Sequence, residues 1–470
     1  MGALRHNQIT ILVVTWLILC VGYFAFGHYM DRSHTESLLL SYAGLWLLSW
    51  PWLRLEQSHQ NQASRPWKYD LFAGLFLRLM LLFSWPNLSQ DVFRFLWDGA
   101  LFAQGFSPYD YTPNTLIQEL NLHGLIIPNF EQLYSTMGAL SAGNFSNYPP
   151  VKQLIFALPQ WIGLKTIIDQ ISVLRLLIIL GDIGVFFLGR RLLLNQSLNP
   201  KYINWYFLNP LIILELTGNV HFEGIMAVTI LTSLLFLTQK KYLYSGIFLG
   251  VGVGLKLIPL MFLPLISASI VGHFHPISKV KIKPLLLFIT GIFATLGLIF
   301  LPLINNENLI NYSATTALWF TKFEFNASIY YLLRWLGFQW KGYNMIAQFG
   351  PLLSIATTLG ILYFSFRVWT QKSNLYQAML GAILIFLLLS TTVHPWYWTT
   401  VLVLSILTQS RIGLLGSALV FLSYTAYGND PVQEHGLWLS IEYIPLFAFI
   451  FWELKNARNT KDQWAKTSSS

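Results

Sequence analysis

The chain has very few charged residues and a single cysteine, and these two shortages narrow the class of protein. Asp, Glu, Lys and Arg together make up 10% of the 470 residues, whereas about a quarter of the residues in a soluble domain are charged. Cys20 is the only cysteine, so no disulfide can form within the chain. No internal repeat and no glycine-rich nucleotide-binding loop are evident. The composition therefore argues against an ordinary soluble protein.

Apolar and aromatic residues take the place of the missing charges. Hydrophobic residues make up 54% of the chain and aromatic residues 16%, including 18 Trp and 35 Phe. This composition is typical of a bilayer protein with Trp and Tyr at its two interfaces. The net charge is +9, but the basic residues lie in short gaps between apolar runs. A nucleic-acid-binding protein gathers them on a soluble face, so we expect a lipid bilayer as partner and no nucleic acid.

Long apolar runs predict an all-α polytopic membrane protein with about 14 (12–14) transmembrane helices. The first run follows Arg5 and has no small-residue cleavage site, so we interpret it as an uncleaved anchor. Several runs are shorter than the about 20 residues of a straight span, and the pair at 242–273 is open to interpretation as one bent or re-entrant element. The runs lie near residues 9–27, 38–53, 70–87, 173–192, 202–218, 221–239, 242–256, 257–273, 285–304, 346–368, 376–393, 396–410, 412–428 and 438–454.

Basic residues predict the orientation of these runs. With the N-terminus in the cytoplasm, 19 of the 29 Lys and Arg residues fall on the cytoplasmic side, and such a bias marks that side. A crossing at 151–168 would reverse every later loop, so we interpret this stretch as a helix that returns to the outer face. We expect cytoplasmic N- and C-termini in an integral protein of the bacterial inner membrane.

The same tracing predicts which polar segments of the chain lie outside the membrane. The largest outer loop runs from about 88 to 172 and carries juxtamembrane helices, and a second outer loop runs from about 305 to 344. We expect a single transmembrane domain over residues 1–455 and a cytoplasmic polar tail over residues 456–470.

Asp91 is the first candidate for chemistry. It opens the large outer loop in Ser89-Gln90-Asp91-Val92-Phe93-Arg94-Phe95-Leu96-Trp97-Asp98-Gly99. A carboxylate at a membrane boundary beside Phe and Trp is partly desolvated, which suits a general base. The alternative is an N-cap, because an amphipathic helix is expected to begin here. The two roles are compatible.

Arg94 and Asp98 lie one turn apart on the same expected helix. Arg94 is placed to pair with Asp91 or to hold a phosphate, and Asp98 is a second carboxylate of the candidate site. The alternative is a local ion pair between Arg94 and Asp98, which stand four residues apart.

Glu215, His221 and Glu223 gather where two apolar runs meet at the outer face. We expect them to orient a sugar or a phosphate; the alternative is a hydrogen-bonded cluster at the membrane boundary. Histidine and glutamate also bind divalent metals, but a single histidine without diagnostic spacing does not define a metal site. We therefore expect no metal centre and no firm cofactor, and leave a divalent ion as an open alternative.

Lys256, His394 and Tyr397 complete the set of expected substrate-binding residues. Lys256 lies alone between two apolar runs, so it either snorkels to the interface or meets an anion such as a lipid phosphate. His394-Pro395-Trp396-Tyr397 lies at another outer turn. It is either part of an aromatic belt or a contact for a sugar or phosphate.

Taken in order, these motifs resemble those of the GT-C superfamily of integral-membrane glycosyltransferases, in particular bacterial polyprenyl-phosphate-mannose-dependent mannosyltransferases. The matching pieces are 91–99, Gly105-Phe106-Ser107-Pro108-Tyr109, Tyr148-Pro149-Pro150, Asn209-Pro210-Leu211 with Glu215 and 218–221, Lys256 before Pro259, and 394–397. One departure is visible, because relatives often carry an Asp shortly after the histidine and here Phe222-Glu223 follows His221.

The resemblance implies a GT-C-like helical fold with its active site at the outer face and Asp91 as the catalytic carboxylate. It implies a polyprenyl-phosphate sugar donor, with mannose as the expected sugar, and a glycan or lipid-linked acceptor. Single displacement would invert the anomeric carbon. The rival hypothesis is a transporter or flippase of lipid-linked sugars, a class that often shows repeated halves and ionisable residues near the bilayer midplane.

Overall fold

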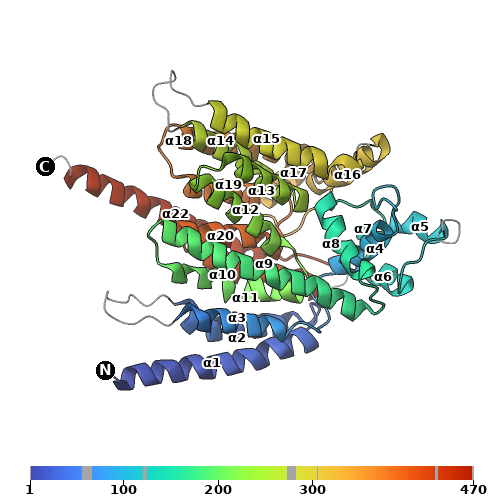
Figure 1. Cartoon of the computed structure of the whole chain (residues 1–470), viewed down its shortest axis with the longest axis horizontal. Helices are drawn as coiled ribbons and strands as arrows, with labels where there is room; N and C mark the ends of the chain where they lie inside the picture. The colour runs from blue at the N-terminus through green and yellow to red at the C-terminus, as the bar shows by residue number, and fades with distance from the viewer. Residues whose placement is uncertain are drawn as a thin grey trace.

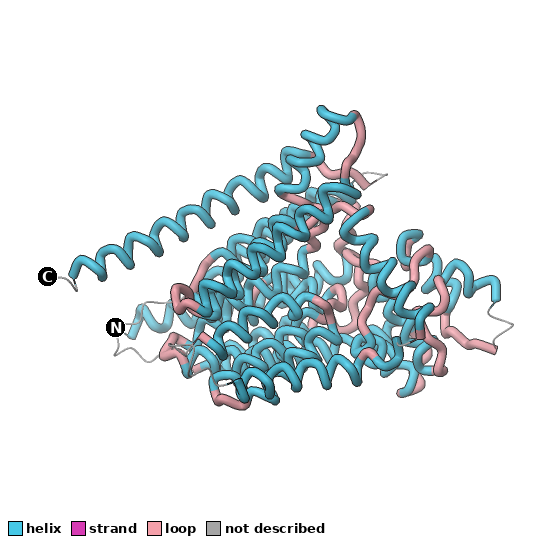
Figure 2. Tube along the Cα trace, turned by 90° about the horizontal axis from the view of Figure 1, so that it is seen from above, coloured by secondary structure: helices cyan, strands magenta, loops and turns pink. Residues whose placement is uncertain are grey.

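The structure is a computed structural model that describes residues 2–54, 66–119, 124–272, 282–303, 305–428 and 432–467. Within these ranges the regular structure is helical, with loops at the two ends of the helices (Figure 2). One isolated bridge pairs Phe325 with Thr392. The all-α prediction is therefore confirmed for the described part of the chain.

The elements of the N-terminal half comprise long apolar helices and a group of short ones between α3 and α9. They are α1 (Gly2–Tyr29), α2 (Thr35–Leu53), α3 (Trp67–Leu79), α4 (Asp91–Ala103), α5 (Pro113–Glu119), α6 (Phe130–Thr136), α7 (Ala139–Ala142), α8 (Pro150–Trp161), α9 (Ile167–Asn195), η1 (Pro200–Ile203), α10 (Asn204–Phe207), α11 (Pro210–Ile212) and the π-helix η2 (Ile213–Gly218).

The C-terminal half continues the helical pattern. Its elements are α12 (Glu223–Thr238), α13 (Tyr242–Leu255), η3 (Ile258–Phe262), α14 (Leu263–Val271), α15 (Ile282–Ile299), η5 (Leu301–Leu303), α16 (Asn306–Thr321), α17 (Ile329–Lys341), α18 (Ile346–Trp369), α19 (Leu375–Leu389), η6 (Pro395–Tyr397), α20 (Trp398–Thr408), α21 (Ile412–Leu419), η7 (Val420–Gly428) and α22 (Gly436–Thr467).

Most of the long helices lie along one direction and form a bundle (Figure 1). Helices α4 to α8 lie together at one end of this bundle, and both chain termini lie at the opposite end (Figure 1). Two termini at the same end are what an even number of crossings requires. The largest loop expected outside the membrane thus forms a separate helical cap over one end of the bundle.

Five helices in the described ranges are long and apolar enough to cross a membrane: Ile9–Tyr29, Ile167–Asn195, Ile282–Ile299, Ile346–Trp369 and Gly436–Asn456. A sixth is possible if Pro210–Gly218 and Glu223–Thr238, bent by 113° at their junction, count as one broken span. The expected count of about 14 is not confirmed.

The difference has a physical reason. Apolar runs such as 242–256 do form helices, but Tyr242–Leu255 and Leu375–Leu389 are shorter apolar helices. At about 1.5 Å per residue, a helix of 14 residues reaches about 21 Å, which is less than the about 30 Å of a hydrocarbon core. Runs of apolar residues therefore overstate the number of straight spans.

The stretch at 151–168 forms the short helix α8 and the loop after it. α8 has 12 residues, which gives a length of about 18 Å and is too short to cross a bilayer. The following crossing helix α9 begins at Ile167, earlier than the Leu174 at which the sequence places its start. The buried side chains of α8 pack mainly against α4.

Small residues allow the helices to pack closely. A Cβ atom at Gly246 of α13 would lie 2.1 Å from the carbonyl oxygen of Phe288 in α15, and one at Gly291 of α15 would lie 2.3 Å from that of Leu243. Such close approach is a main source of helix association in lipid, where apolar side chains gain little by leaving the bilayer.

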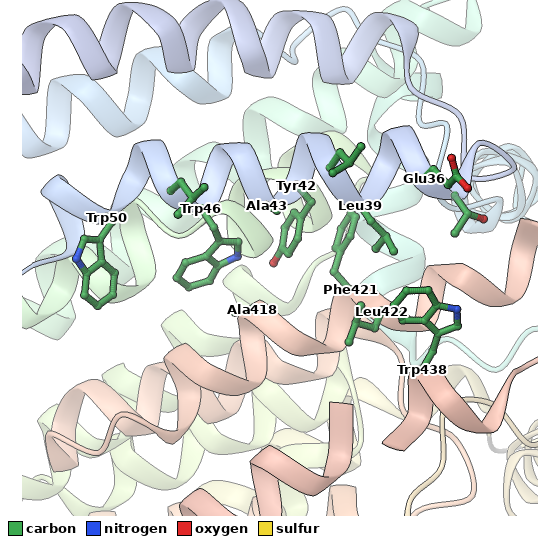
Figure 3. Close-up of a pocket in the computed structure, with 13 residues that line it drawn as sticks. Glu36, Leu39, Tyr42, Ala43, Trp46, Trp50, Ala418, Phe421, Leu422 and Trp438 are labelled. Carbon is green, nitrogen blue, oxygen red and sulfur yellow. The ribbon is translucent and has the colours of Figure 1, made fainter. Parts of the chain in front are cut away.

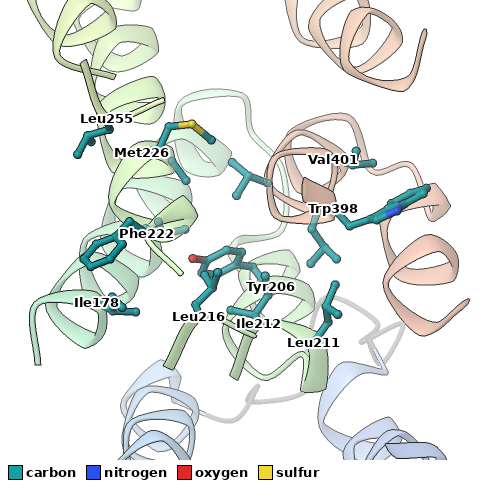
Figure 4. Packing of buried hydrophobic residues seen from close by; sticks show 14 of the residues in the cluster. Ile178, Tyr206, Leu211, Ile212, Leu216, Phe222, Met226, Leu255, Trp398 and Val401 are labelled. Carbon is teal, nitrogen blue, oxygen red and sulfur yellow. The ribbon is translucent and has the colours of Figure 1, made fainter. Parts of the chain in front are cut away.

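A dense apolar core lies below the cap and includes Tyr206, Leu216, Phe222 and Trp398, which come from different helices (Figure 4). Trp398 is 1% exposed. Gly416 on α21 leaves room for its ring, because a Cβ atom there would come within 1.9 Å of the indole. This core supports the loops that carry the polar residues of the candidate site.

The bundle predicts that the two ends of α9 are labelled from opposite sides of the membrane. In a Cys20→Ala background, single cysteines are placed at the exposed residues Asp110 and Asn195. We expect a membrane-impermeant maleimide to label one of them in intact cells and the other only after permeabilisation. Labelling of both from one side would contradict a crossing by α9.

Candidate active site

Asp91 begins helix α4 at the membrane-facing edge of the cap. Gln90 is the N-cap, and the Asp91 N–H contacts the Ser89 hydroxyl at 3.3 Å. Asp91 is therefore the first residue of the helix and not its N-cap. Its side chain is 40% exposed, so the carboxylate opens to solvent on one side while protein surrounds it on the others.

The rest of α4 is buried against α8, which holds Asp91 in place. Phe95 stacks on Phe156 with ring centres 4.4 Å apart and planes at 10°. Gly99 lies so close to α8 that a Cβ atom would be 2.0 Å from the carbonyl oxygen of Phe156. Because these contacts leave no room for movement, α4 presents Asp91 from a rigid platform.

Arg94 and Asp98 pair with each other and not with Asp91. The Nε atom of Arg94 lies 2.6 Å from Oδ1 of Asp98, and both side chains are buried. Arg94 also donates to the carbonyl oxygens of Ser141 and Asn144 at 2.5 and 2.9 Å. The geometry thus matches the local ion pair, which fastens α4 to the loop after α7.

His221 lies in the break between η2 and α12. Val220 before it has a φ of 63°, a left-handed conformation that a β-branched residue rarely adopts. Such strain costs on the order of 1–3 kcal/mol and is kept where the surroundings enforce it. Here the His221 N–H donates to the carbonyl oxygen of Leu216 at 3.1 Å. The chain therefore turns sharply and directs His221 toward α4.

The His221 ring faces Asp91 on one side and Glu215 on the other. Nδ1 lies 2.9 Å from the carbonyl oxygen of Glu215, and because a carbonyl only accepts, Nδ1 carries the hydrogen. Nε2 lies 3.9 Å from Oδ2 of Asp91, which is too long for a direct hydrogen bond. Nε2 has no hydrogen-bond partner within the described part of the chain. A hydroxyl group placed between these two atoms has one hydrogen to donate, and the Asp91 carboxylate can accept it.

Glu215 lies behind His221, deeper in the protein. Its side chain is fully buried and accepts hydrogen bonds from the Tyr424 hydroxyl at 2.7 Å and the Asn219 amide at 3.2 Å. Asn219 in turn accepts from the Leu88 N–H at 3.3 Å. Glu215 therefore joins the break at His221 to the segment before Asp91 and does not point at the open side of the site.

Glu223 and Lys256 form a buried ion pair at the start of α12. Nζ of Lys256 lies 2.5 Å from Oε1 of Glu223, with the two side chains 20% and 2% exposed. The same ammonium lies 4.0 Å from the centre of the Tyr397 ring. Oε2 of Glu223 has no hydrogen-bond partner among the described residues. Three residues expected from separate parts of the sequence thus meet at one place.

His394 joins this group through a stack of rings. The Trp396 ring lies between two imidazoles, 3.7 Å from that of His221 and 4.5 Å from that of His394. Phe325 of the second outer loop stacks on the other face of His394 at 5.1 Å. Burial lowers the pKa of His394 to about 3, so its imidazole is neutral near pH 7.

Lys152 is the residue that the sequence reasoning missed. It lies on α8, is 6% exposed, and its ammonium lies 5.2 to 5.9 Å from the ring centres of Tyr148, Phe222 and Phe95. No salt bridge to Lys152 is present in the described ranges. The available signal was a lysine near the start of the apolar stretch 151–168, whose other charge, Lys165, lies near its end.

Lys152 and Asp91 act on each other electrostatically. Burial lowers the pKa of Lys152 to about 8, and the nearby carboxylates of Glu223 and Asp91 oppose this shift. Burial raises the pKa of Asp91 above its ordinary value, and the charges of His221, Lys152 and Lys256 oppose that rise. An acid and two cations therefore share one small space.

Arg175 on α9 positions the site without entering it. Its guanidinium donates to the carbonyl oxygens of Leu82 and Ser84 at 3.0 and 2.5 Å, and to those of Thr217 and Gly218 at 2.8 and 2.5 Å. These carbonyls belong to the segments before Asp91 and before His221. A single buried cation thus sets how the two segments lie relative to each other.

The described residues contain no group of three or more His, Cys, Asp or Glu side chains arranged to hold a metal ion. What the site offers is a carboxylate that accepts a proton, a histidine nitrogen without a partner and two lysines that attract an anion. Asp91, His221, Glu223, Lys256, His394 and Tyr397 meet here as expected from the sequence; Arg94, Asp98 and Glu215 support them from behind.

Comparison with known proteins gives the family. Residues 10–272 match the family described as "Alpha-(1->6)-mannopyranosyltransferase, N-terminal domain". The chain belongs to this family. The matched region contains Asp91, Lys152, His221 and Lys256, whereas His394 lies beyond it. The resemblance to membrane mannosyltransferases is thereby confirmed.

A curated relative is similar over about half of the chain. The protein "Alpha-(1->6)-mannopyranosyltransferase A" of Corynebacterium glutamicum is 23% identical over 275 residues, which covers 54% of this chain and 50% of that protein. The match therefore spans about half the length of this mannopyranosyltransferase.

The position of Arg175 predicts a stability effect. In Arg175→Met, four carbonyl groups lose a donor; that of Leu82 still accepts from the Ser172 hydroxyl, and each of the other three, left unsatisfied, costs about 1–3 kcal/mol. We expect the melting temperature of the protein in nanodiscs to fall by several degrees, as a change of a few kcal/mol does. The control is Arg191→Met, an exposed arginine on the same helix. An equal melting temperature for both variants would contradict the role of Arg175.

Proposed function

We propose that this protein is a membrane glycosyltransferase that moves mannose from a polyprenyl-phosphate donor to an acceptor hydroxyl at the outer face. The proposal rests on one observation: Asp91 opens to solvent at the edge of the cap, 3.9 Å from His221 and beside two buried lysines. Membership of a mannopyranosyltransferase family supports mannose as the sugar that is transferred. The helical cap lies at the end of the bundle away from both termini, which supports the outer face as the place of the reaction (Figure 1).

Asp91 is the general base in this proposal. The acceptor hydroxyl lies between Asp91 and Nε2 of His221 and loses its proton to the Asp91 carboxylate as its oxygen attacks the anomeric carbon. A carboxylate with a raised pKa is a better base than one in water, provided that it stays ionised. The neighbouring lysines keep it ionised.

The lysines hold the leaving group. As the new bond forms, the bond between the anomeric carbon and the phosphate oxygen breaks, and negative charge collects on the lipid phosphate. Cations held in place beforehand stabilise this charge without reorganising. Lys256 is already paired with Glu223, whereas Lys152 has no ion-pair partner in the described ranges. Lys152 is therefore the main phosphate contact.

A single displacement inverts the anomeric carbon, so a β-linked donor gives an α-mannoside. The name of the Corynebacterium glutamicum relative describes an α-(1→6) product. By analogy we infer a mannose-containing acceptor that presents a primary 6-hydroxyl. No nucleotide-binding glycine loop is evident in the sequence, which agrees with a lipid-linked donor.

Replacement of the base predicts loss of transfer. General-base catalysis contributes about 10²–10⁴-fold, so we expect Asp91→Asn to lower the rate of mannose transfer by at least two orders of magnitude while the melting temperature is unchanged. The assay uses purified protein in lipid with polyprenyl-phosphate mannose, and product mass is the readout. The control is Asp110→Asn, an exposed carboxylate of the same loop. Full activity of Asp91→Asn would remove Asp91 as the base.

The charges of the site predict a bell-shaped dependence of kcat/KM on pH. On the acid side the rate rises as Asp91 ionises; on the alkaline side it falls near pH 8 as Lys152 loses its proton. In Lys152→Met the acid limb moves to higher pH, because removing a nearby cation raises the pKa of Asp91. In Lys152→Arg the alkaline limb moves upward, because the guanidinium stays charged.

The matched control is Lys165→Met, an exposed lysine in the loop between α8 and α9. We expect the wild-type profile from this variant. An unchanged acid limb in Lys152→Met, or an alkaline limb near pH 8 in Lys152→Arg, would show that Lys152 does not act on the site.

A further inference from the structure

An apolar groove of about 780 Å³ lies between α2, η7 and α22. Leu39, Trp46 and Trp50 line it from α2, and Phe421 and Trp438 line it from the opposite side (Figure 3). Its size falls within the about 300–1,000 Å³ that ligand sites occupy. The lining is aromatic and aliphatic, so its ligand is a hydrocarbon chain.

The groove runs along the bundle and not across it. Trp50 lies at one end of the row of side chains and Glu36 at the other (Figure 3). Trp50 follows Thr35 by 15 positions, which corresponds to about 22 Å of helix. Because α2 begins at the end of the bundle where the cap lies (Figure 1), the groove reaches from the interior of the bundle toward the candidate active site.

A series of residue contacts leads from the cap end of the groove toward that site. Thr35 lies against Gly428 at the end of η7, where a Cβ atom would come within 2.3 Å of the threonine hydroxyl. The neighbouring Tyr427 has its ring centre 5.7 Å from that of Phe325, which stacks on His394. Aromatic contacts therefore lead from the groove to the ring stack beside the catalytic base.

A cation stands at this junction. The guanidinium carbon of Arg32 lies 4.6 Å from the centre of the Tyr427 ring, and no salt bridge to Arg32 is present in the described part of the chain. Glu36, which also lines the groove at this end, is exposed. A phosphate at the junction would be attracted by Arg32 and repelled by Glu36.

We propose that this groove holds the prenyl chain of the lipid-phosphate donor, with Arg32 facing the donor phosphate at its cap end. The inference rests on the proposed function, because that function supplies the donor. Lipid tails are as apolar as the groove itself, so the groove selects by shape: branched isoprene units pack against the flat faces of Trp46, Trp50 and Trp438.

Filling the groove tests its role in activity. Ala43 is an exposed groove residue on α2, and Ala294 is an exposed residue of α15 outside the groove. We expect Ala43→Trp to raise KM for a long-chain polyprenyl-phosphate mannose about tenfold, equivalent to about 1.4 kcal/mol. Its kcat, and its KM for a donor cut to two isoprene units, stay unchanged. Ala294→Trp behaves as wild type.

Two results of this assay would overturn the inference: an unchanged KM of Ala43→Trp for the long donor, or an equal rise for both donors. If the wild-type protein transfers mannose from neither donor, the proposed function fails instead. A binding experiment then tests separately whether the groove binds a prenyl chain. It uses a photoreactive polyprenyl phosphate that carries no sugar.

We expect this probe to crosslink to α2 in wild-type protein and in Ala294→Trp, and to lose that label in Ala43→Trp. Polyprenyl phosphate should compete for the label, and phosphatidylglycerol should not. Equal competition by phosphatidylglycerol would make the occupant an ordinary membrane lipid and overturn the inference, as would labelling of α15 instead of α2.

Arg32 is tested with charged and uncharged lipids. Arg32→Gln should weaken competition by polyprenyl phosphate but not by the alcohol polyprenol, whereas Arg32→Lys keeps most of the effect. The control is Lys165→Gln, an exposed lysine at the same end of the bundle. An equal loss for phosphate and alcohol would show that Arg32 does not face the phosphate.

Discussion

The geometry of the candidate site depends on one buried guanidinium. Arg175 donates to carbonyl groups in two segments, 82–84 and 217–218, that lie far apart in the sequence. Both segments end a helix and expose carbonyls that have no helical partner. In a medium without water these groups must be satisfied within the protein. The same hydrogen bonds therefore stabilise the fold and set the distance between Asp91 and His221.

The two lysines of the candidate site differ in whether they have an ion-pair partner. Lys256 is neutralised by Glu223, whereas Lys152 is held over three aromatic rings without a salt bridge in the described ranges. A buried cation without a counterion is costly unless an anion arrives. A phosphate ligand satisfies that requirement, and the nearby cations oppose the rise that burial causes in the pKa of Asp91. In the proposed reaction, the same lysines thus bind the phosphate and act on the pKa of Asp91.

Much of the site was predictable because its polar residues interrupt long apolar runs. Asp91, His221 and Lys256 each stand where such a run ends, and the ends of spans on one face of a membrane share one depth. Lys152 was missed for the opposite reason: it lies inside an apolar run, and hydropathy does not distinguish burial against protein from burial in lipid. The expected number of spans is not confirmed, because short helices such as α13 are as apolar as long ones.

The sequence by itself determined that the chain is helical, belongs in a membrane and gathers ionisable groups at one face, because composition and the length of apolar runs decide these properties. The tertiary structure alone decided which ionisable side chains form ion pairs with each other. Arg94 is three residues from Asp91 and four from Asp98, yet it pairs with Asp98, and its guanidinium also donates to the carbonyl oxygens of Ser141 in α7 and Asn144 after it. Lateral contacts depend on how closely helices approach, and that depends on packing at positions such as Gly99.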